Sequence, residues 1–408
     1  MIETTTLDNG LRLVVDQRPG QVVYCGLAID AGTRDQQPDE SGMAHFIEHM
    51  SFKGTQRRRA WHIINRMEAV GGDLNAYTGK EHTVYYCSTL RQHLSRALDL
   101  LFDITLSSTY PQSEIEREVE VIIDEIESYN DSPSELIYDD FEALLFHGHP
   151  LGYNILGDAA RLRQYQTADL QRFVRRLYHP SSMVLFVYGD VTLREVERMA
   201  LRLCQAEAHS MDSHKRRTFP HSQLSTLNFQ LKKDTHQAHV IVGCPTYAMG
   251  DPRYRGLYLL NNILGGPGMN SRLNVALRER RGLVYTVESS LTGYTDTGVW
   301  TTYFGCDHDD VDKCCRLVSR ELSRLLDAPL SDSQLAAAKR QLQGQAALSW
   351  ENGENVAISM GRRLLHLGQT QTLEQFCQEI DALTSQQLWD IARDTFDPAH
   401  LVTLVYTR

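Results

Sequence analysis

The sequence predicts an α+β protein made of two tandem homologous domains, each an antiparallel or mixed sheet packed with helices. Its 408 residues exceed what one hydrophobic core usually holds and suggest two domains of about 200 residues each. In both halves, segments that read as alternating strands are followed by segments that read as amphipathic helices. A pattern of aromatic, proline and aliphatic positions in the first half also recurs in the second. These observations favour two copies of one domain.

The repeat is clearest in two segments that each read as helix, turn and strand, ending in LYHPSSMVLFVYGD and TFDPAHLVTLVYTR. The positions that match at one constant spacing are Leu170 and Leu388, Phe173 and Ile391, Tyr178 and Phe396, Pro180 and Pro398, Val187 and Val405, and Tyr188 and Tyr406. Strand-then-helix segments beginning at Thr83 and Trp300 form a second match. We predict homologous domains over 1–206 and 226–408, joined by a polar, aperiodic linker over 207–225.

Local patterns predict further elements in chain order. Residues 11–17 and 22–32 read as two strands around the Pro19-Gly20 turn, which predicts a hairpin. Acidic residues at helical spacing predict a long helix from about Ser113 to Ser128. A second long helix is predicted from about Ser331 to Trp350.

Composition and charge exclude several classes of function. The chain is 42% hydrophobic and 23% charged with a net charge of −11, so no nucleic-acid partner is expected. No apolar run approaches the roughly 20 residues that span a bilayer, and the first residues lack the pattern of a secretory signal. The eight cysteines show no C-x-x-C spacing and favour free thiols. We therefore expect a cytoplasmic protein without membrane contact.

The most informative segment is the pentapeptide His45-Phe46-Ile47-Glu48-His49, with Ser41 upstream as the expected helix cap. Residues three and four apart share one helix face, so both imidazoles and the Glu48 carboxylate project into one small volume. Two histidines one turn apart can hold a zinc ion, with the glutamate placed as a general base for attacking water. The order H-x-x-E-H reverses that of commoner zinc peptidases and defines the inverzincins.

Two histidines are not a complete catalytic site, because catalytic zinc normally takes three protein ligands and keeps a fourth position open. The acidic helix predicted downstream offers candidates for the third ligand. Glu118 and Glu125 lie two helical turns apart on one face, and Glu120 and Glu127 share that spacing. The pattern alone does not choose between the two pairs.

The segments GMAHFIEHMSFKGT, GGDLNAYTGKEHTVYY and EIEREVEVIIDEI resemble the pitrilysin-type inverzincin metallopeptidases. The likeness extends over essentially the whole chain and is closest to the mitochondrial-processing-peptidase branch and its short bacterial relatives. It implies one zinc ion per chain, bound by His45, His49 and Glu125, with Glu48 as general base. It also gives Glu118 a supporting role that orients a ligand or tunes the local charge.

The resemblance further implies how a peptide is held. Arg278 and Tyr285, in the second half, match a family pair that binds the substrate backbone and supports the transition state. Asn75 and Ala76 match a strand edge that pairs with an extended substrate through backbone hydrogen bonds. Without the resemblance, the sequence favours an ordinary basic helix end and a strand tyrosine for Arg278 and Tyr285. Asn75 and Ala76 fit an ordinary hairpin equally well.

Glu135 and Asp139 lie four apart on a predicted helix and face the same way. They match the acidic pair that recognises a basic residue in mitochondrial processing peptidase. The resemblance therefore implies a preference for Arg or Lys near the scissile bond. Neighbouring Asp131, Asp140 and Glu142 fit a generally acidic surface helix as well.

Taken together, the resemblance implies a zinc metalloendopeptidase that hydrolyses short or unfolded, extended peptides. The matching helix of the second half, around 258–264, offers neither histidine nor carboxylate. Long family members join four such domains and close them as a clam shell, so a two-domain chain is expected to supply half of the chamber. A two-fold homodimer is the simplest assembly, and a heterodimer with a related subunit is the alternative.

Two other functions compete with this interpretation. Some relatives keep the fold as a non-catalytic scaffold or substrate-binding subunit of a processing-peptidase-like complex, although these usually lose part of the metal motif. A purely structural zinc is the third possibility, and it gives no reason for Glu48 between the two histidines.

Overall fold

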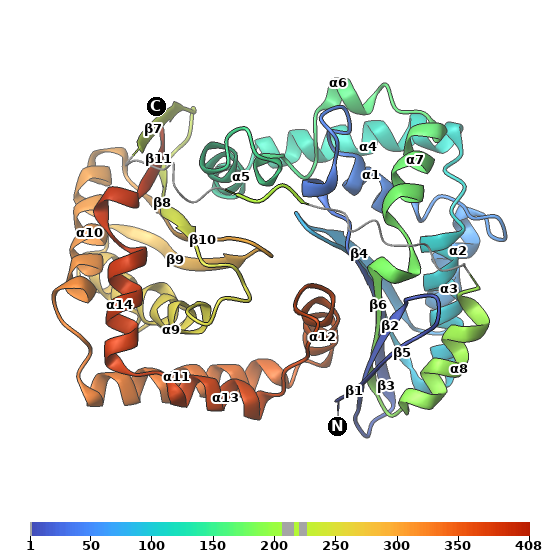
Figure 1. Ribbon diagram of the computed structural model, residues 1–408. Coiled ribbons are helices and arrows are strands. Elements are labelled where there is room, and N and C mark those ends of the chain that lie inside the picture. Colours follow the sequence, from blue (N-terminus) through green and yellow to red (C-terminus); the bar gives the residue numbers. More distant parts are fainter. Residues whose placement is uncertain (1, 206–215, 220–226) are drawn as a thin grey trace. The chain divides into compact units, whose positions relative to one another are not determined.

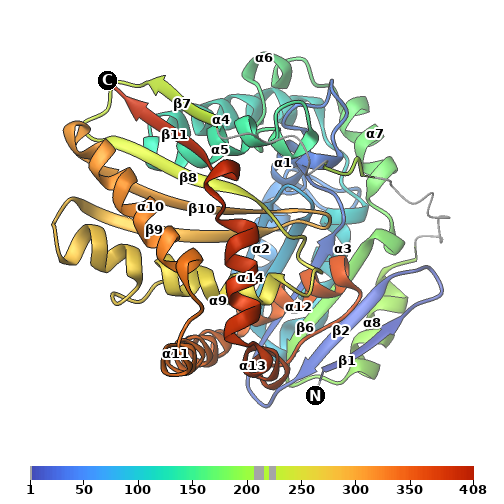
Figure 2. The same cartoon turned by 60° about the vertical axis from the view of Figure 1, so that its left-hand side comes forward.

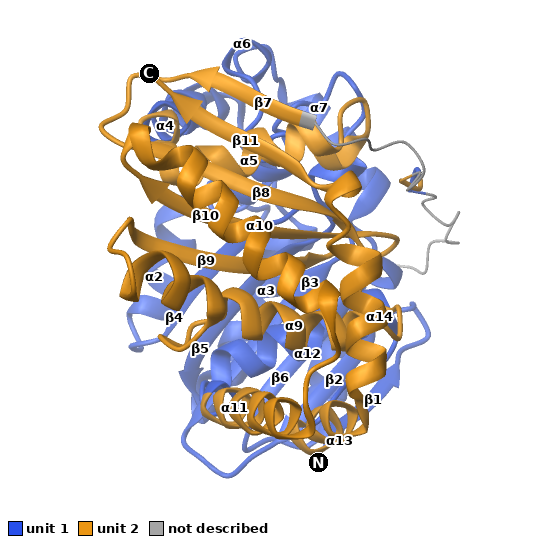
Figure 3. Ribbon diagram, turned by 90° about the vertical axis from the view of Figure 1, so that its left-hand side faces the viewer, with its two compact units in different colours: residues 1–128, 153–217, 349–372 blue, residues 129–152, 218–348, 373–408 orange. Residues whose placement is uncertain are grey.

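The computed structural model describes residues 2–205, 216–219 and 227–408 (Figure 1). Contacts within the chain divide it into two compact units, which Figure 3 colours separately. Unit 1 comprises Met1–Ser128, Tyr153–Arg217 and Ser349–Thr372, and unit 2 comprises Tyr129–Gly152, Thr218–Leu348 and Leu373–Arg408. Each unit therefore draws on both halves of the sequence.

Unit 1 contains a six-stranded sheet in the order β1-β2-β6-β3-β5-β4. Its strands are β1 (Ile2–Thr6), β2 (Arg12–Gln17), β3 (Val22–Ile29), β4 (Asp73–Thr78), β5 (Thr83–Leu90) and β6 (Met183–Gly189). β6 lies between β2 and β3, parallel to the first and antiparallel to the second. The hairpin predicted from residues 11–17 and 22–32 is therefore wrong. A strand from far along the chain separates the two, and no local pattern reveals that insertion.

Helices cover both faces of this sheet. Those of unit 1 are α1 (Met43–Met50), α2 (Ala60–Glu68), α3 (Leu94–Leu106), most of α4 (Gln112–Asn130), α6 (Ala159–Leu162), α7 (Thr167–Leu177), α8 (Leu193–Leu203) and α12 (Gly353–Leu367). Leu13 and Val15 of β2 belong to a core shared with α1, α3 and α7. Val14 points to the opposite face, where it packs in a core with Ala357 and Met360 of α12. Alternation along β2 thus buries both faces.

Unit 2 repeats the arrangement with a five-stranded sheet in the order β7-β11-β8-β10-β9. Its strands are β7 (Leu227–Lys232), β8 (Ala238–Thr246), β9 (Val284–Gly293), β10 (Gly298–Cys306) and β11 (Val402–Thr407). Its helices are α5 (Pro133–Leu145), α9 (Tyr254–Gly265), α10 (Val311–Asp327), most of α11 (Asp332–Trp350), α13 (Leu373–Ala382) and α14 (Ser385–Thr395). β11 lies between β7 and β8, as β6 lies between β2 and β3. The prediction of two domains, each with a sheet packed by helices, is confirmed.

One helix from each half packs on the sheet of the other half (Figures 1 and 2). α5 follows α4 and joins unit 2, where Phe141 packs against the sheet at Gly243. α12 follows α11 and joins unit 1. The contact-defined units therefore differ from the contiguous domains 1–206 and 226–408, which stay predictions as boundaries of the repeat. Most of the predicted linker, 207–225, lies outside the described residues.

Among the described residues, no helix combines the length and apolarity that a bilayer-spanning segment needs. The predicted cytoplasmic location stays a prediction.

Candidate metal centre

Helix α1 presents the pentapeptide residues from an almost wholly buried position. The helix begins at Gly42, whose φ of +77° lies in the left-handed region, and no side chain caps it. A Cβ at Gly42 would lie 2.7 Å from the carbonyl oxygen of Leu156, so this start requires glycine. The predicted cap at Ser41 is therefore wrong, because backbone packing sets the helix start.

Three predicted ligands come together beside α1. Nε2 of His49 lies 3.6 Å and Nε2 of His45 lies 3.9 Å from Oε2 of Glu125. All three donor atoms lie within 4.8 Å of one another. Zinc–ligand bonds of about 2.0–2.2 Å place tetrahedral ligand atoms roughly 3.5 Å apart, so the cluster has the dimensions of a zinc site. The Glu125 side chain is 44% exposed, which keeps the cluster open to solvent on one side.

The structure also separates the two glutamate pairs that the sequence left open. Glu125 and Glu118 face α1, whereas Glu120 is exposed and forms an ion pair with Arg163 at 3.4 Å. Glu127 is exposed as well.

Glu118 orients one of the two imidazoles. Nδ1 of His49 donates to Oε1 of Glu118 at 3.0 Å, and Nζ of Lys53 lies 2.5 Å from its Oε2. Burial opposes ionisation of Glu118, but the hydrogen bonds from His49 and Lys53 lower the pKa of this carboxyl. With Nδ1 protonated, His49 turns the lone pair of Nε2 toward Glu125 and the cluster centre.

His45 lacks such support. Its Nδ1 is buried and has no hydrogen-bond partner among the described residues. Burial, with a smaller contribution from His49, lowers the pKa of His45 to about 3, which keeps the imidazole neutral at pH 7. Neutral imidazole is the form that coordinates a metal.

Glu48 is fixed by a residue that the sequence did not single out. Oγ1 of Thr78 donates a 2.6 Å hydrogen bond to Oε2 of Glu48. Burial raises the pKa of Glu48, and the Thr78 hydroxyl offsets part of that rise. Thr78 is the last residue of β4, and nothing in the local pattern indicates that it reaches α1.

The predicted substrate edge lies on the same strand. β4 has a sheet neighbour on one side only, β5, to which it pairs antiparallel with Asn75 opposite Tyr86 and Ala76 opposite Tyr85. Asn75 is exposed. An open strand edge thus leads directly to the threonine that contacts Glu48.

Unit 2 contains a cavity of about 610 Å³ that holds one member of the predicted acidic pair. Glu135 of α5 and Glu288 of β9 both line it, and the hydroxyl of Tyr138 donates to Glu288 at 2.8 Å. Asp139 is not among the residues that line it. Burial raises the pKa of the Tyr129 hydroxyl, and the nearby carboxylates of Asp139 and Glu135 raise it further. Glu135 thus lines the cavity, and both carboxylates lie near Tyr129, which lines it too. Glu288 gave no sequence signal.

Two of the other acidic residues on α5 have structural partners. Asp140 accepts a 2.7 Å hydrogen bond from Tyr406, and Glu142 accepts a 2.8 Å hydrogen bond from Tyr294. These bonds fasten α5 to the rest of unit 2, so its acidic character is only partly available to a ligand.

The predicted substrate-binding pair lies in unit 2. Arg278 belongs to a π-helical turn, Asn274–Glu279, and its guanidinium carbon lies 5.8 Å from the ring centre of Tyr285. Tyr285, near the start of β9, is 84% exposed and lines the same cavity as Glu135. π-helical turns are rare and frequently occur at functional sites.

Comparisons with known proteins agree with this architecture. Residues 12–159 match the family described as insulinase (peptidase family M16), and residues 165–342 match the peptidase M16 inactive domain. An uncharacterized zinc protease of Bacillus subtilis, YmxG, is 31% identical, over 99% of this chain and 98% of the relative. An uncharacterized zinc protease of Streptomyces coelicolor is also 31% identical, over 96% of this chain and 87% of the relative.

Two solved structures share the fold. A protease from Helicobacter pylori has a TM-score of 0.93 at 22% identity, covering 100% of this chain and 99% of that one. A peptidase M16 inactive domain from Pseudomonas fluorescens has a TM-score of 0.91 at 21% identity, covering 100% and 97%. With full-length relatives above 30% identity and both family domains matched in order, the chain belongs to the insulinase family of peptidases, family M16.

Proposed function

We propose that the chain is a zinc-dependent endopeptidase, with His45, His49 and Glu125 as metal ligands and Glu48 as general base. The observation that carries the proposal is that three ligand atoms from α1 and α4 meet beside the buried carboxylate of Glu48, which lies on α1 with the two histidines. Two imidazoles and one carboxylate form the donor set of many catalytic zinc sites, which keep one coordination position open. Homologues named zinc proteases support the same reaction class.

Three side chains of this protein have roles beside the metal: Glu48 transfers the proton, and Thr78 and Glu118 position Glu48 and His49. When bound, zinc polarises the scissile carbonyl and lowers the pKa of water toward 7. Glu48 accepts a proton from the attacking water and passes it to the leaving amine. Thr78 occupies Oε2 of Glu48 and leaves Oε1 to carry that proton. Glu118 holds His49 in the tautomer that coordinates through Nε2.

The substrate we propose is a short or unfolded peptide in an extended conformation. Its backbone would pair with the open edge of β4 at Asn75 and Ala76, which requires no particular sequence. The cavity beside Glu135 and Glu288 suits a basic side chain, since carboxylates and tyrosine faces both attract cations. Arg278 and Tyr285 are proposed to bind the substrate backbone.

For the assembly we propose a two-fold homodimer. Each chain carries both the metal cluster and the Arg278–Tyr285 pair, so two identical chains hold every predicted part. Sedimentation equilibrium gives the mass directly: about twice the chain mass of 46.4 kDa supports the dimer, and a monomer or a requirement for a different subunit contradicts it.

The reaction is tested with purified protein, a quenched peptide containing arginine, and metal analysis of the same sample. Wild type is expected to cleave the peptide, and a chelator should abolish cleavage until zinc is restored. Glu48→Gln should keep its zinc and lose activity by about 10²- to 10⁴-fold, the usual contribution of general-base catalysis. Glu127→Gln, an exposed change on α4, is the matched control and should retain activity.

Two outcomes contradict the proposal. Activity that survives in Glu48→Gln would remove the assigned general base. Wild type that binds zinc and cleaves no unfolded peptide would favour the non-catalytic scaffold instead.

A further inference from the structure

A second cavity in unit 2 is lined mainly by arginines. It has a volume of about 470 Å³, and its walls include five arginines and one acidic residue: Arg272, Arg280, Arg281, Arg320, Arg324 and Glu321. Arg280 and Arg281 directly follow the π-helical turn Asn274–Glu279, and Arg320 and Arg324 lie one turn apart on α10. The five positive charges stand out in a chain with a net charge of −11.

Internal partners satisfy only part of this charge. Arg324 forms an ion pair with Glu321 at 2.6 Å, and Arg281 donates to the carbonyl oxygen of Ala276 at 2.7 Å. The guanidinium groups of Arg272, Arg280 and Arg320 form no hydrogen bond or ion pair with any residue that the structure describes. Three cations therefore line the cavity without a protein partner among the described residues.

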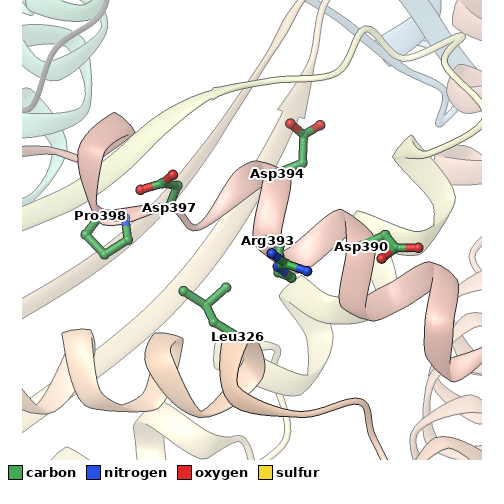
Figure 4. Close-up of a pocket in the computed structure, with 6 residues that line it drawn as sticks. All are labelled: Leu326, Asp390, Arg393, Asp394, Asp397 and Pro398. Atoms are coloured by element: carbon green, nitrogen blue, oxygen red, sulfur yellow. The ribbon is translucent and has the colours of Figure 1, made fainter.

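Another charged cavity of unit 2 shows the contrast (Figure 4). It is lined by Asp390, Asp394 and Asp397, and each of these carboxylates accepts a hydrogen bond from the protein. The donors are Gln386 at 2.9 Å, Tyr247 at 2.6 Å and the backbone N–H of Ala399 at 2.9 Å. The carboxylates of that cavity are hydrogen-bonded within the protein, whereas three guanidinium groups of the arginine cavity have no such partner among the described residues.

The physical state of Arg272 indicates an anionic occupant. Its side chain is half-buried, and burial lowers the pKa of its guanidinium; Glu321 counteracts this and Arg324 adds to it. Like charges held close together in a partly desolvated space repel one another, and an anion among them relieves that repulsion. Guanidinium groups match phosphate oxygens with paired hydrogen bonds, so phosphate is the best-fitting chemistry.

We propose that this cavity binds a short chain of phosphates, either a free inorganic oligophosphate or the triphosphate of a nucleotide. The lining arginines come from α10 and from the residues in and around the π-helical turn, so a chain of phosphates is expected to contact more of them than one orthophosphate does. The bound anion would tie the π-helical turn to α10. That turn also carries Arg278, so the proposed site adjoins this predicted substrate-binding residue, which is not itself among the lining residues.

Calorimetric titration of the full chain tests the proposal, with tripolyphosphate, ATP and orthophosphate as probes. Tripolyphosphate should bind once per chain, at least about tenfold more tightly than orthophosphate, and more weakly as salt rises. Equal affinity for ATP and tripolyphosphate assigns recognition to the phosphates alone, and tighter ATP binding points to a nucleotide. The titration is run on metal-free protein too, so its result does not depend on peptidase activity.

Variants locate the binding. Arg320→Gln and Arg272→Gln should each weaken tripolyphosphate binding by about tenfold or more, the usual loss for a hydrogen bond to a charged group. Arg316→Gln, one turn earlier on α10 and outside the cavity lining, should change the affinity by less than about twofold. Circular dichroism and thermal unfolding confirm that each variant is folded. A folded wild type without saturable tripolyphosphate binding, or equal affinities across all three variants and wild type, overturns the assignment.

Discussion

Helix α1 of unit 1 and helix α9 of unit 2 are the matching helices of the repeated fold, but their buried polar residues have different roles. In unit 1, α1 buries His45 and Glu48, and its imidazole nitrogens face a carboxylate from another helix. In unit 2, α9 buries Asn261, which accepts a hydrogen bond from Nε1 of Trp300 at 3.0 Å and donates to the carbonyl of Ser289 at 3.3 Å. The same fold thus holds α9, whose buried Asn261 is hydrogen-bonded within unit 2, and α1, whose imidazole nitrogens can bind a cation.

The difference teaches that the architecture alone does not make the metal site. Both units insert a late strand beside an early one, and both follow a 19-residue helix with a helix that packs on the other sheet. Only α1 and α4 carry ligand side chains at facing positions, and no equivalent cluster occurs among the described residues of unit 2. Metal binding should therefore depend on a few side chains in unit 1.

The largest effect should come from making α1 resemble α9. His49→Asn removes one ligand and the partner of Glu118, so zinc content should fall far below one per chain and kcat/KM by about 10³-fold or more. Metal analysis and peptide cleavage measure both. The reciprocal Tyr258→His adds an imidazole to α9 at an exposed position, and zinc should stay at one per chain. A second bound zinc would contradict the view that a facing carboxylate is required.

Lowering the pH should destabilise unit 1 through the buried side chain of His366. In unit 1, Nε2 of His366 lies 3.1 Å from Nδ1 of His82, and burial, with nearby Arg216 and Arg362, lowers the pKa of His366 to about 3. The unfolded chain binds this proton at about 6.5, so it takes up more protons between pH 6.5 and 3 and stability falls as pH drops through that window. At pH 4 the loss from this one group is about 3 kcal/mol.

His366→Gln should remove the His366 contribution to the acid sensitivity of unit 1, while burial also lowers the pKa values of His45 and His82 and their contributions remain. Hydrogen exchange of metal-free protein at pH 7 and pH 4 reports the opening of each sheet separately. The variant should open less readily than wild type at pH 4 in β3 and α12, with unit 2 unchanged. His400→Gln, an exposed change in unit 2, is the control and should leave both profiles alone. Equal acid sensitivity in wild type and His366→Gln would show that other groups control it.

Glu118→Gln tests the support for His49 with a smaller change. The amide keeps the volume but no longer favours the Nδ1-protonated tautomer, so zinc affinity should fall by about 10–100-fold. Competition with a chromogenic chelator measures the affinity. Glu120→Gln on the same helix, where the carboxylate pairs only with exposed Arg163, should leave the affinity unchanged. Similar losses in both variants would point to the general charge of α4 instead.

The sequence predicts those parts of the site that are close together in the chain. His45, Glu48 and His49 need only helical spacing to share a face, and the structure places them so. Spacing could not separate Glu118 and Glu125 from Glu120 and Glu127, because that choice depends on how α4 is rotated against α1. Family resemblance selected the pair that the structure brings to α1.

Long-range pairing explains what the sequence did not predict. The false hairpin arose because β6 enters between β2 and β3 from a point far along the chain. The exchange of α5 and α12 likewise leaves no periodic signal, since an amphipathic helix has the same pattern on either sheet. Glu288 and Thr78 become visible only once two distant segments are placed side by side.

Thr78 gives the smallest predicted effect and the finest test of how unit 1 differs from unit 2. Its hydroxyl holds Oε2 of buried Glu48 at 2.6 Å, so its loss should let the carboxylate turn away from the attacking water without affecting the metal. Thr78→Val keeps the shape and removes the donor; kcat should fall by about tenfold, the typical value of a hydrogen bond to a charged group, while KM and zinc content stay within about twofold. Thr78→Ser restores the donor and should recover most of kcat. A purely structural role for Thr78 predicts instead that Ser, which lacks the methyl group, is no better than Val, and that both lose stability without a separate effect on kcat.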